Sequence, residues 1–268
     1  MHSGQPRALD DLLWLLPLGF GLVALQHFGR LLPDSGVIMV WSVMTLLIGS
    51  GAFMRVRVRR RAWLEAYVAA GSPLRRWLRG GALLLLTRLL LAGGLAAVLF
   101  VSILRLHAPV EVVLLLVSLL LLVGLRALAT RTFGRHVSAH YLPESAWRFT
   151  LTLTFVALCA ALMSLAMWRP GPDFAHATLE QAAWHLAIRE EAASPLLLQA
   201  LSIAAALEGV SWWLAQHALP RLEWPLLQWL AWLLVLAKSA LFVWAWLHCC
   251  VGTMLLPTLW KRADAPSQ

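Results

Sequence analysis

The chain contains no asparagine, and only two of its 268 residues are lysine. Charged side chains of all kinds make up 13% of the residues, whereas an average soluble domain has roughly 25%. Hydrophobic residues reach 60%, and the mean hydropathy is +0.74. This shortage of charge excludes an ordinary soluble domain and indicates a protein immersed in a lipid bilayer.

Cysteine is also scarce, which limits the redox chemistry open to the chain. Its three cysteines, Cys159, Cys249 and Cys250, all lie in apolar runs and form no CxxC motif. They predict neither a disulfide framework nor a thiol redox site. The 20 arginines far outnumber the lysines, a bias expected of a GC-rich coding sequence. We therefore expect a bacterial protein of the inner membrane.

The recurrent catalytic motifs are missing as well. The sequence has no G-x-S-x-G, no P-loop, no H-E-x-x-H and no dense cluster of carboxylates. An enzyme is therefore not the favoured hypothesis, and no cofactor is predicted. His136 and His140 have the i, i+4 spacing that places two imidazoles on one helical face, but spacing fixes no third ligand, so no metal site is predicted.

Seven apolar segments are present, each long enough to cross the hydrocarbon core as a helix. Because an unpaired backbone is costly in lipid and these runs do not alternate, helices rather than a barrel are expected. The sequence thus predicts an all-α, polytopic membrane bundle forming one transmembrane domain over 1–268. The expected spans are 12–32, 36–54, 82–104, 109–129, 149–168, 195–218 and 225–247.

The net charge of +9 comes mainly from arginines between these segments, which favours contact with lipid headgroups over nucleic acid. The basic segment 55–81 and the arginines near 131–148 predict cytoplasmic loops, with a cytoplasmic N-terminus. Seven spans then place Lys261 and Arg262 outside. The alternative of six spans, with the stretch 169–195 lying along a surface, returns both residues to the cytoplasm.

Two connecting segments carry interfacial patterns. The outer loop 169–194 is amphipathic, and a short helix is expected within 177–192 because Leu179, Ala183 and Leu186 have helical spacing. The basic segment mixes arginine with aromatic residues, which predicts a lipid-facing anchor or a docking surface for a cytoplasmic partner. The residues expected at the headgroup interface are Arg55, Arg57, Arg59, Arg60, Arg61, Trp63, Arg75, Arg76, Trp77, Arg79, Trp147 and Trp224.

A short pattern recurs before three of the spans. The chain reads PLRRW at 73–77, PESAW at 143–147 and PRLEW at 220–224. Arg30 and Gly49 are also matched by Arg105 and Gly124, each 75 residues later. One interpretation is a repeated helical hairpin. The other is local, because proline suits the first turn of a helix and tryptophan suits the headgroup level.

Two opposite charges fall inside the last two spans. Counting from the loop between them, Glu208 lies about 18 Å deep and Lys238 about 20 Å deep at the usual helical rise. In an antiparallel hairpin the two side chains meet, which offsets a burial cost of about 2.5–3.5 kcal/mol per charge. We therefore predict an intramembrane pair of Glu208 and Lys238, with Ala205 and Gly209 allowing close helix approach.

Two classes of function remain. Sparse polarity within the membrane favours a membrane-embedded subunit or assembly factor of a larger complex, bound to other membrane proteins or to copies of itself. The alternative is a channel or transporter that uses Glu208 and Lys238 as a gate or coupling pair. A lipid-modifying enzyme is the third hypothesis.

Overall fold

The computed structural model describes residues 8–67, 82–106, 108–135, 142–168, 171–217 and 225–263. Within these ranges the regular structure is helical. A 3-10 turn, η1 (Gly29–Leu31), follows the first helix. The helices are α1 (Ala8–Phe28), α2 (Asp34–Tyr67), α4 (Ala82–Leu104), α5 (Pro109–Phe133), α6 (Leu142–Trp168), α7 (Leu179–Ala187), α8 (Pro195–His217) and α9 (Pro225–Ala263).

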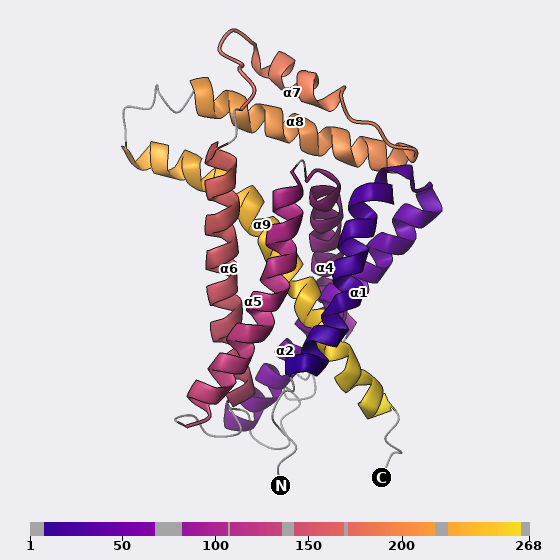
Figure 1. Ribbon diagram of the computed structural model, residues 1–268, viewed down its shortest axis with the longest axis vertical. Coiled ribbons are helices and arrows are strands. Elements are labelled where there is room, and N and C mark those ends of the chain that lie inside the picture. Colours follow the sequence, from indigo (N-terminus) through magenta and orange to yellow (C-terminus); the bar gives the residue numbers. More distant parts are fainter. Residues whose placement is uncertain are drawn as a thin grey trace.

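Seven of the described helices, all but α7, are long and apolar enough to cross a membrane. Their directions nevertheless differ. α1, α2, α4, α5, α6 and most of α9 run between the two ends of the molecule, whereas α7 and α8 lie across one end (Figure 1). α1 begins and α9 ends at the opposite end, the lower one in Figure 1. The all-α membrane bundle predicted from the sequence is confirmed.

The core lies along the bundle axis and consists of leucine, alanine and other apolar side chains, most of them from α1, α2, α4, α5 and α9, with smaller contributions from α6 and α8. One pair of its buried polar groups is hydrogen-bonded across helices. The indole Nε1 of Trp246 on α9 donates to Ser118 Oγ on α5 at 2.9 Å, and Ser118 donates to Leu115 O at 2.6 Å. Such pairing removes the cost of an unsatisfied donor in an apolar interior.

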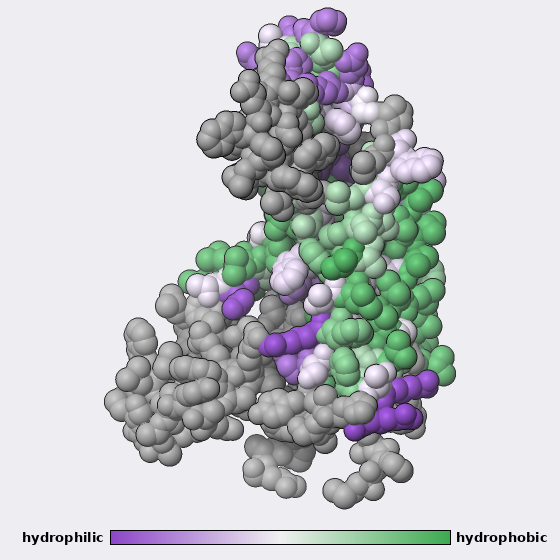
Figure 2. Space-filling view, turned by 90° about the vertical axis from the view of Figure 1, so that its left-hand side faces the viewer, coloured by the Kyte–Doolittle hydropathy of each residue, from purple (hydrophilic) through white to green (hydrophobic). Residues whose placement is uncertain are grey.

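Large apolar side chains also cover much of the outside of the bundle. Phe20 and Leu90, for example, are 74% and 67% exposed. Figure 2 shows a broad hydrophobic area at middle height, with hydrophilic residues gathered at the upper and lower ends. An apolar band between polar ends is the surface expected of a protein that spans a bilayer.

Two glycines let α2 and α9 cross with their backbones in contact. A Cβ at Gly252 would lie 1.9 Å from the carbonyl oxygen of Leu47, and a Cβ at Gly51 would lie 3.0 Å from Gly252 Cα. Small residues at such crossings are how membrane helices gain packing contacts.

α2 is longer than its predicted span, because the helix continues without a break from Asp34 to Tyr67. The first half of the basic segment 55–81 is thus part of a long helix. The structure describes only the backbone for Arg55, Arg57, Arg59, Arg60, Arg61 and Trp63. The other expected interface residues that lie outside the described ranges are Arg75, Arg76, Trp77, Arg79 and Trp224. The histidine pair His136 and His140 lies outside them as well.

Candidate functional site

A row of alternating charges lies where α7 and α8 meet the bundle. We call it the end network, and it consists of Arg30, Glu190, Arg105, Glu208 and Lys238. Arg30 belongs to η1 after α1, and Arg105 directly follows α4. Glu190 comes from the segment after α7, Glu208 from α8 and Lys238 from α9. Five different parts of the chain therefore converge on one site.

Each charge in the end network contacts a charge of opposite sign. Arg30 Nη2 lies 3.2 Å from Glu190 Oε2, and the guanidinium of Arg105 donates from Nη1 to Glu190 Oε1. The same guanidinium donates from Nη2 to Glu208 Oε2 at 2.7 Å. Lys238 Nζ donates to that carboxylate oxygen at 3.0 Å. Arg105 is thus the central member, because it bridges both glutamates.

The centre of the end network is buried and its two outer members are not. The side chains of Glu190 and Arg105 are 8% and 9% exposed, whereas those of Arg30 and Lys238 are 36% and 56% exposed. A buried charge is stable only when it is paired and hydrogen-bonded. Three cations face two carboxylates, so the network carries one net positive charge.

Arg30 and Arg105 also bind backbone carbonyl groups. Arg30 Nη2 donates to Leu104 O at 3.2 Å, at the carboxyl end of α4. Arg105 Nη1 lies 3.4 Å from Leu201 O on α8. A cation at a helix carboxyl end is favourable because the last carbonyls there lack partners within the helix.

The predicted contact between Glu208 and Lys238 is present, but its expected depth needs correction. Glu208 also binds Arg105, which lies just beyond the end of α4, so the pair is at one end of the bundle rather than at mid-depth. Counting residues from the loop assumed that α8 runs along the membrane normal. Because α8 lies across the bundle (Figure 1), its helical rise does not measure depth.

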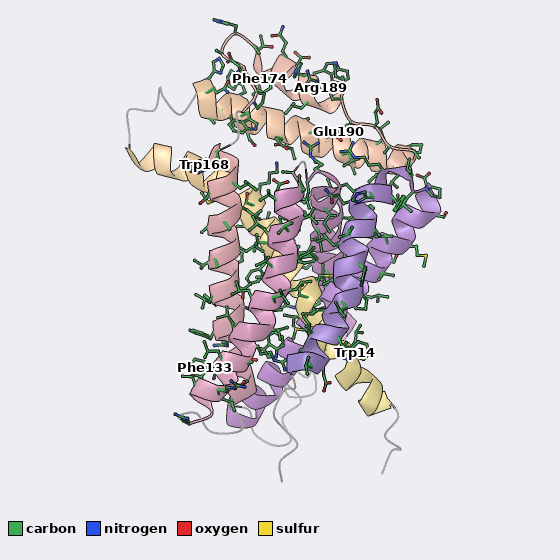
Figure 3. The ribbon with its side chains drawn as sticks, viewed as in Figure 1. Trp14, Phe133, Trp168, Phe174, Arg189 and Glu190 are labelled. Atoms are coloured by element: carbon green, nitrogen blue, oxygen red, sulfur yellow. The ribbon has the colours of Figure 1, made fainter. Side chains whose placement is uncertain are left out.

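A second contact holds the start of α8 to the same end of the bundle. The hydroxyl of Ser194 donates to Asp34 Oδ1, at the first residue of α2, and accepts from Leu197 N at 3.1 Å. The adjacent Ala193 N donates to Arg30 O at 2.9 Å. Figure 3 shows Glu190 at the end of the molecule where α8 lies, opposite the end that holds Trp14 and Phe133.

α7 is the short outer helix predicted within 177–192, and together with α8 it forms what we call the cap (171–217). Thr178 caps its first turn by accepting from Gln181 N at 3.2 Å. Gly209 and the fully buried Ala205 allow close approach as predicted, but the neighbour at Gly209 is α7 rather than α9. A Cβ at Gly209 would lie 2.2 Å from Ala182 O.

A smaller cluster lies at the other end of the bundle. Arg126 Nη1 donates to Asp11 Oδ2 at 2.9 Å, and its guanidinium lies 4.4 Å from the ring centroid of Trp147. Trp147 is 9% exposed. Its ring is therefore covered by protein and packs against the Arg126 guanidinium, and its placement at headgroup level stays a prediction.

Sequence reasoning did not identify Glu190 or Arg105 as partners of Glu208 and Lys238. One signal was available, because Arg30 and Arg105 occupy matching positions 75 residues apart, and both guanidinium groups contact Glu190. No comparable signal marked Glu190, since it lies in an irregular segment with other acidic residues.

The chemistry offered by the end network is electrostatic. Each of its cations contacts a carboxylate. The described residues contain no group of three or more His, Cys, Asp or Glu side chains that could hold a metal ion. The arrangement can therefore fasten the cap to the bundle and present Arg30 and Lys238 to the surroundings. Protein-family models, curated proteins and solved structures were compared with this chain, and none of them matches it.

Proposed function

We propose that the protein is a membrane-embedded subunit or assembly factor of a larger complex, and that the cap is a surface that contacts a partner. The observation that carries this proposal is the exposed side of α7 and of the residue that caps its end: Trp184 is 68% exposed, and Ile188, directly after Ala187, is 60% exposed. The two residues are four apart and so are neighbours on the helix. Large exposed aromatic and aliphatic side chains on a firm support are typical contact residues of interfaces.

Hydrogen bonds hold the segment before α7 to α8. Trp213 Nε1 donates to Ala177 O at 2.9 Å. Gln216 Nε2 donates to Pro172 O, and Gln216 Oε1 accepts from Phe174 N, each at 2.8 Å. The end network then ties the cap to the bundle. A surface held in this way loses little conformational freedom on binding, which favours association.

Site-specific photo-crosslinking tests the proposal. A photoreactive amino acid at Trp184 or Ile188 is expected to yield one defined protein adduct in intact cells. The control is Val113 on α5, which is 55% exposed on the apolar side of the bundle and should crosslink to lipid. The proposal fails if positions 184 and 188 give no protein adduct while Val113 gives its lipid adduct.

We also propose that the protein resides in a bacterial inner membrane with the end opposite the cap in the cytoplasm. The support is the charge distribution. The arginines of the second half of α2, Arg131 at the end of α5 and Arg148 at the start of α6 belong to the end that lies away from the cap (Figure 1). Positive charge favours the cytoplasmic side.

A channel or transporter is the second candidate, favoured by the alternation of charges and by the half-exposed Lys238. If transport uses the pair, Glu208→Gln should abolish flux in vesicles while the protein accumulates to its normal level. Glu144→Gln is a matched control, because Glu144 lies outside the end network and pairs with the exposed Arg148 at 3.1 Å. Equal flux in Glu208→Gln and the unaltered protein removes this candidate.

A further inference from the structure

α8 is attached to one end of the bundle at two points along its length. Ser194, directly before the helix, is bonded to Asp34 at the start of α2, and Glu208 is bonded to Arg105 after the end of α4. The two points are 14 residues apart, which corresponds to about 21 Å along a helix. A helix that crossed the bilayer would separate them by most of that distance in depth, yet both lie at the same end.

The sides of α8 have different neighbours. Ser202 and Gly209 face α7, which lies on the far side of α8 from the bundle (Figure 1). Trp213 bonds Ala177 in the segment that leads into α7. Glu208 faces the bundle through Arg105. A third side carries Leu196, Ile203 and Leu207, which are 53%, 56% and 62% exposed.

The exposed side is a continuous apolar stripe. The spacings of 7 and 11 residues place Leu196, Ile203 and Leu207 in line along an α-helix. Ala200, Val210 and Leu214 continue the same line and are partly exposed. None of the six side chains is polar, and the stripe is about 27 Å long at the usual rise per residue.

We propose that α8 is an in-plane helix whose apolar stripe lies in the membrane leaflet opposite the two ends of the chain. The occupant of the stripe is phospholipid, because the stripe faces neither α7 nor Arg105 and is exposed and apolar, like the outer side chains of the bundle. Helices of this kind sit at the boundary between headgroups and acyl chains. Lys238 and Arg30, the exposed cations of the end network, lie at the same level and complement headgroup phosphates.

This placement determines how often the chain crosses the membrane. α1, α2, α4, α5, α6 and α9 cross, and α8 does not, so the chain crosses six times and its two ends share one side. Lys261 and Arg262 at the end of α9 then join the other basic segments on that side. Seven crossings would place Lys261 and Arg262 on the side opposite the other basic segments, whereas six crossings place all of them on one side, as the positive-inside rule expects.

Spin-label depth measurements test the proposal directly. Labels are attached to single cysteines at Leu196, Ile203, Leu207 and Leu214, in a variant whose native cysteines are replaced by alanine. The protein is reconstituted in phosphatidylethanolamine and phosphatidylglycerol vesicles, and depth is measured from collisions with oxygen and a nickel chelate. An in-plane helix gives one shared, shallow depth at all four positions.

Val113, Val117 and Leu120 on α5 are the control positions, since they are exposed on a helix that runs along the bundle. Their depths should change progressively by about 1.5 Å per residue. A similar gradient along α8, with its deepest point in mid-helix, would overturn the proposal. So would labels that lie in water at all four α8 positions.

The crossing number has an independent test in whole cells. Ser3→Cys and Ser267→Cys are labelled with a membrane-impermeant maleimide before and after the membrane is opened. Both positions are expected to become reactive only after opening, because both ends lie on the cytoplasmic side. Reactivity of Ser267→Cys alone in intact cells would mean an odd number of crossings and would refute the in-plane assignment. This result does not depend on whether the cap binds a partner.

Discussion

Arg105→Ala should release the cap and destabilise the protein by about 3 to 5 kcal/mol, the usual cost of removing one partner from a buried ion pair. Arg105 donates to both Glu190 and Glu208, and its side chain is 9% exposed. Without it, the buried carboxylate of Glu190 keeps, among the described residues, the 3.2 Å contact with the cation of Arg30. Thermal unfolding in detergent and limited proteolysis of the cap measure the effect.

The exposed Arg189 supplies the matched control, because Arg189→Ala removes the same charge one residue away from Glu190. This variant should unfold within about 0.5 kcal/mol of the unaltered protein. The double variant Arg105→Ala with Glu190→Ala should recover part of the loss, since the unpaired buried carboxylate is gone. Equal stability of the Arg105→Ala and Arg189→Ala variants would show that the end network does not hold the cap.

Gly252→Leu should prevent α2 and α9 from packing, and Gly252→Ala should already cost about 1 to 3 kcal/mol. Any Cβ at this position would meet the carbonyl oxygen of Leu47 at 1.9 Å. Because the obstacle is backbone, relief requires the two helices to move apart, which also loses the core contacts of Val251 and Ile48. Folded yield after detergent extraction and the unfolding midpoint report both variants.

Gly124→Ala is the control for this second prediction. Gly124 lies within α5, and a Cβ there would meet nothing within 4 Å. Alanine favours a helix over glycine by up to about 1 kcal/mol, so this variant should be neutral or slightly more stable. If Gly252→Ala behaves like Gly124→Ala, the backbone contact between α2 and α9 does not determine how these helices pack.

Parts of the candidate site could be predicted from the sequence. Glu208 and Lys238 were identified as partners because isolated charges in apolar runs are costly and need a counter-charge. Arg105 and Glu190 were not identified as their partners, because each stands outside an apolar run, where a charge needs no explanation. The contact of Trp147 with the guanidinium of Arg126 was not predicted either, because it joins residues from separate helices.

The sequence by itself determined that the chain is an all-α membrane protein, because hydropathy and segment length record how much apolar surface each helix carries. It could not determine the direction of α8, since hydropathy averaged along a segment is the same for a crossing helix and an in-plane one. That direction was decided by tertiary contacts such as the one between Arg105 and Glu208, which are 103 residues apart. Such contacts form only when separate helices pack together, and no local pattern encodes them.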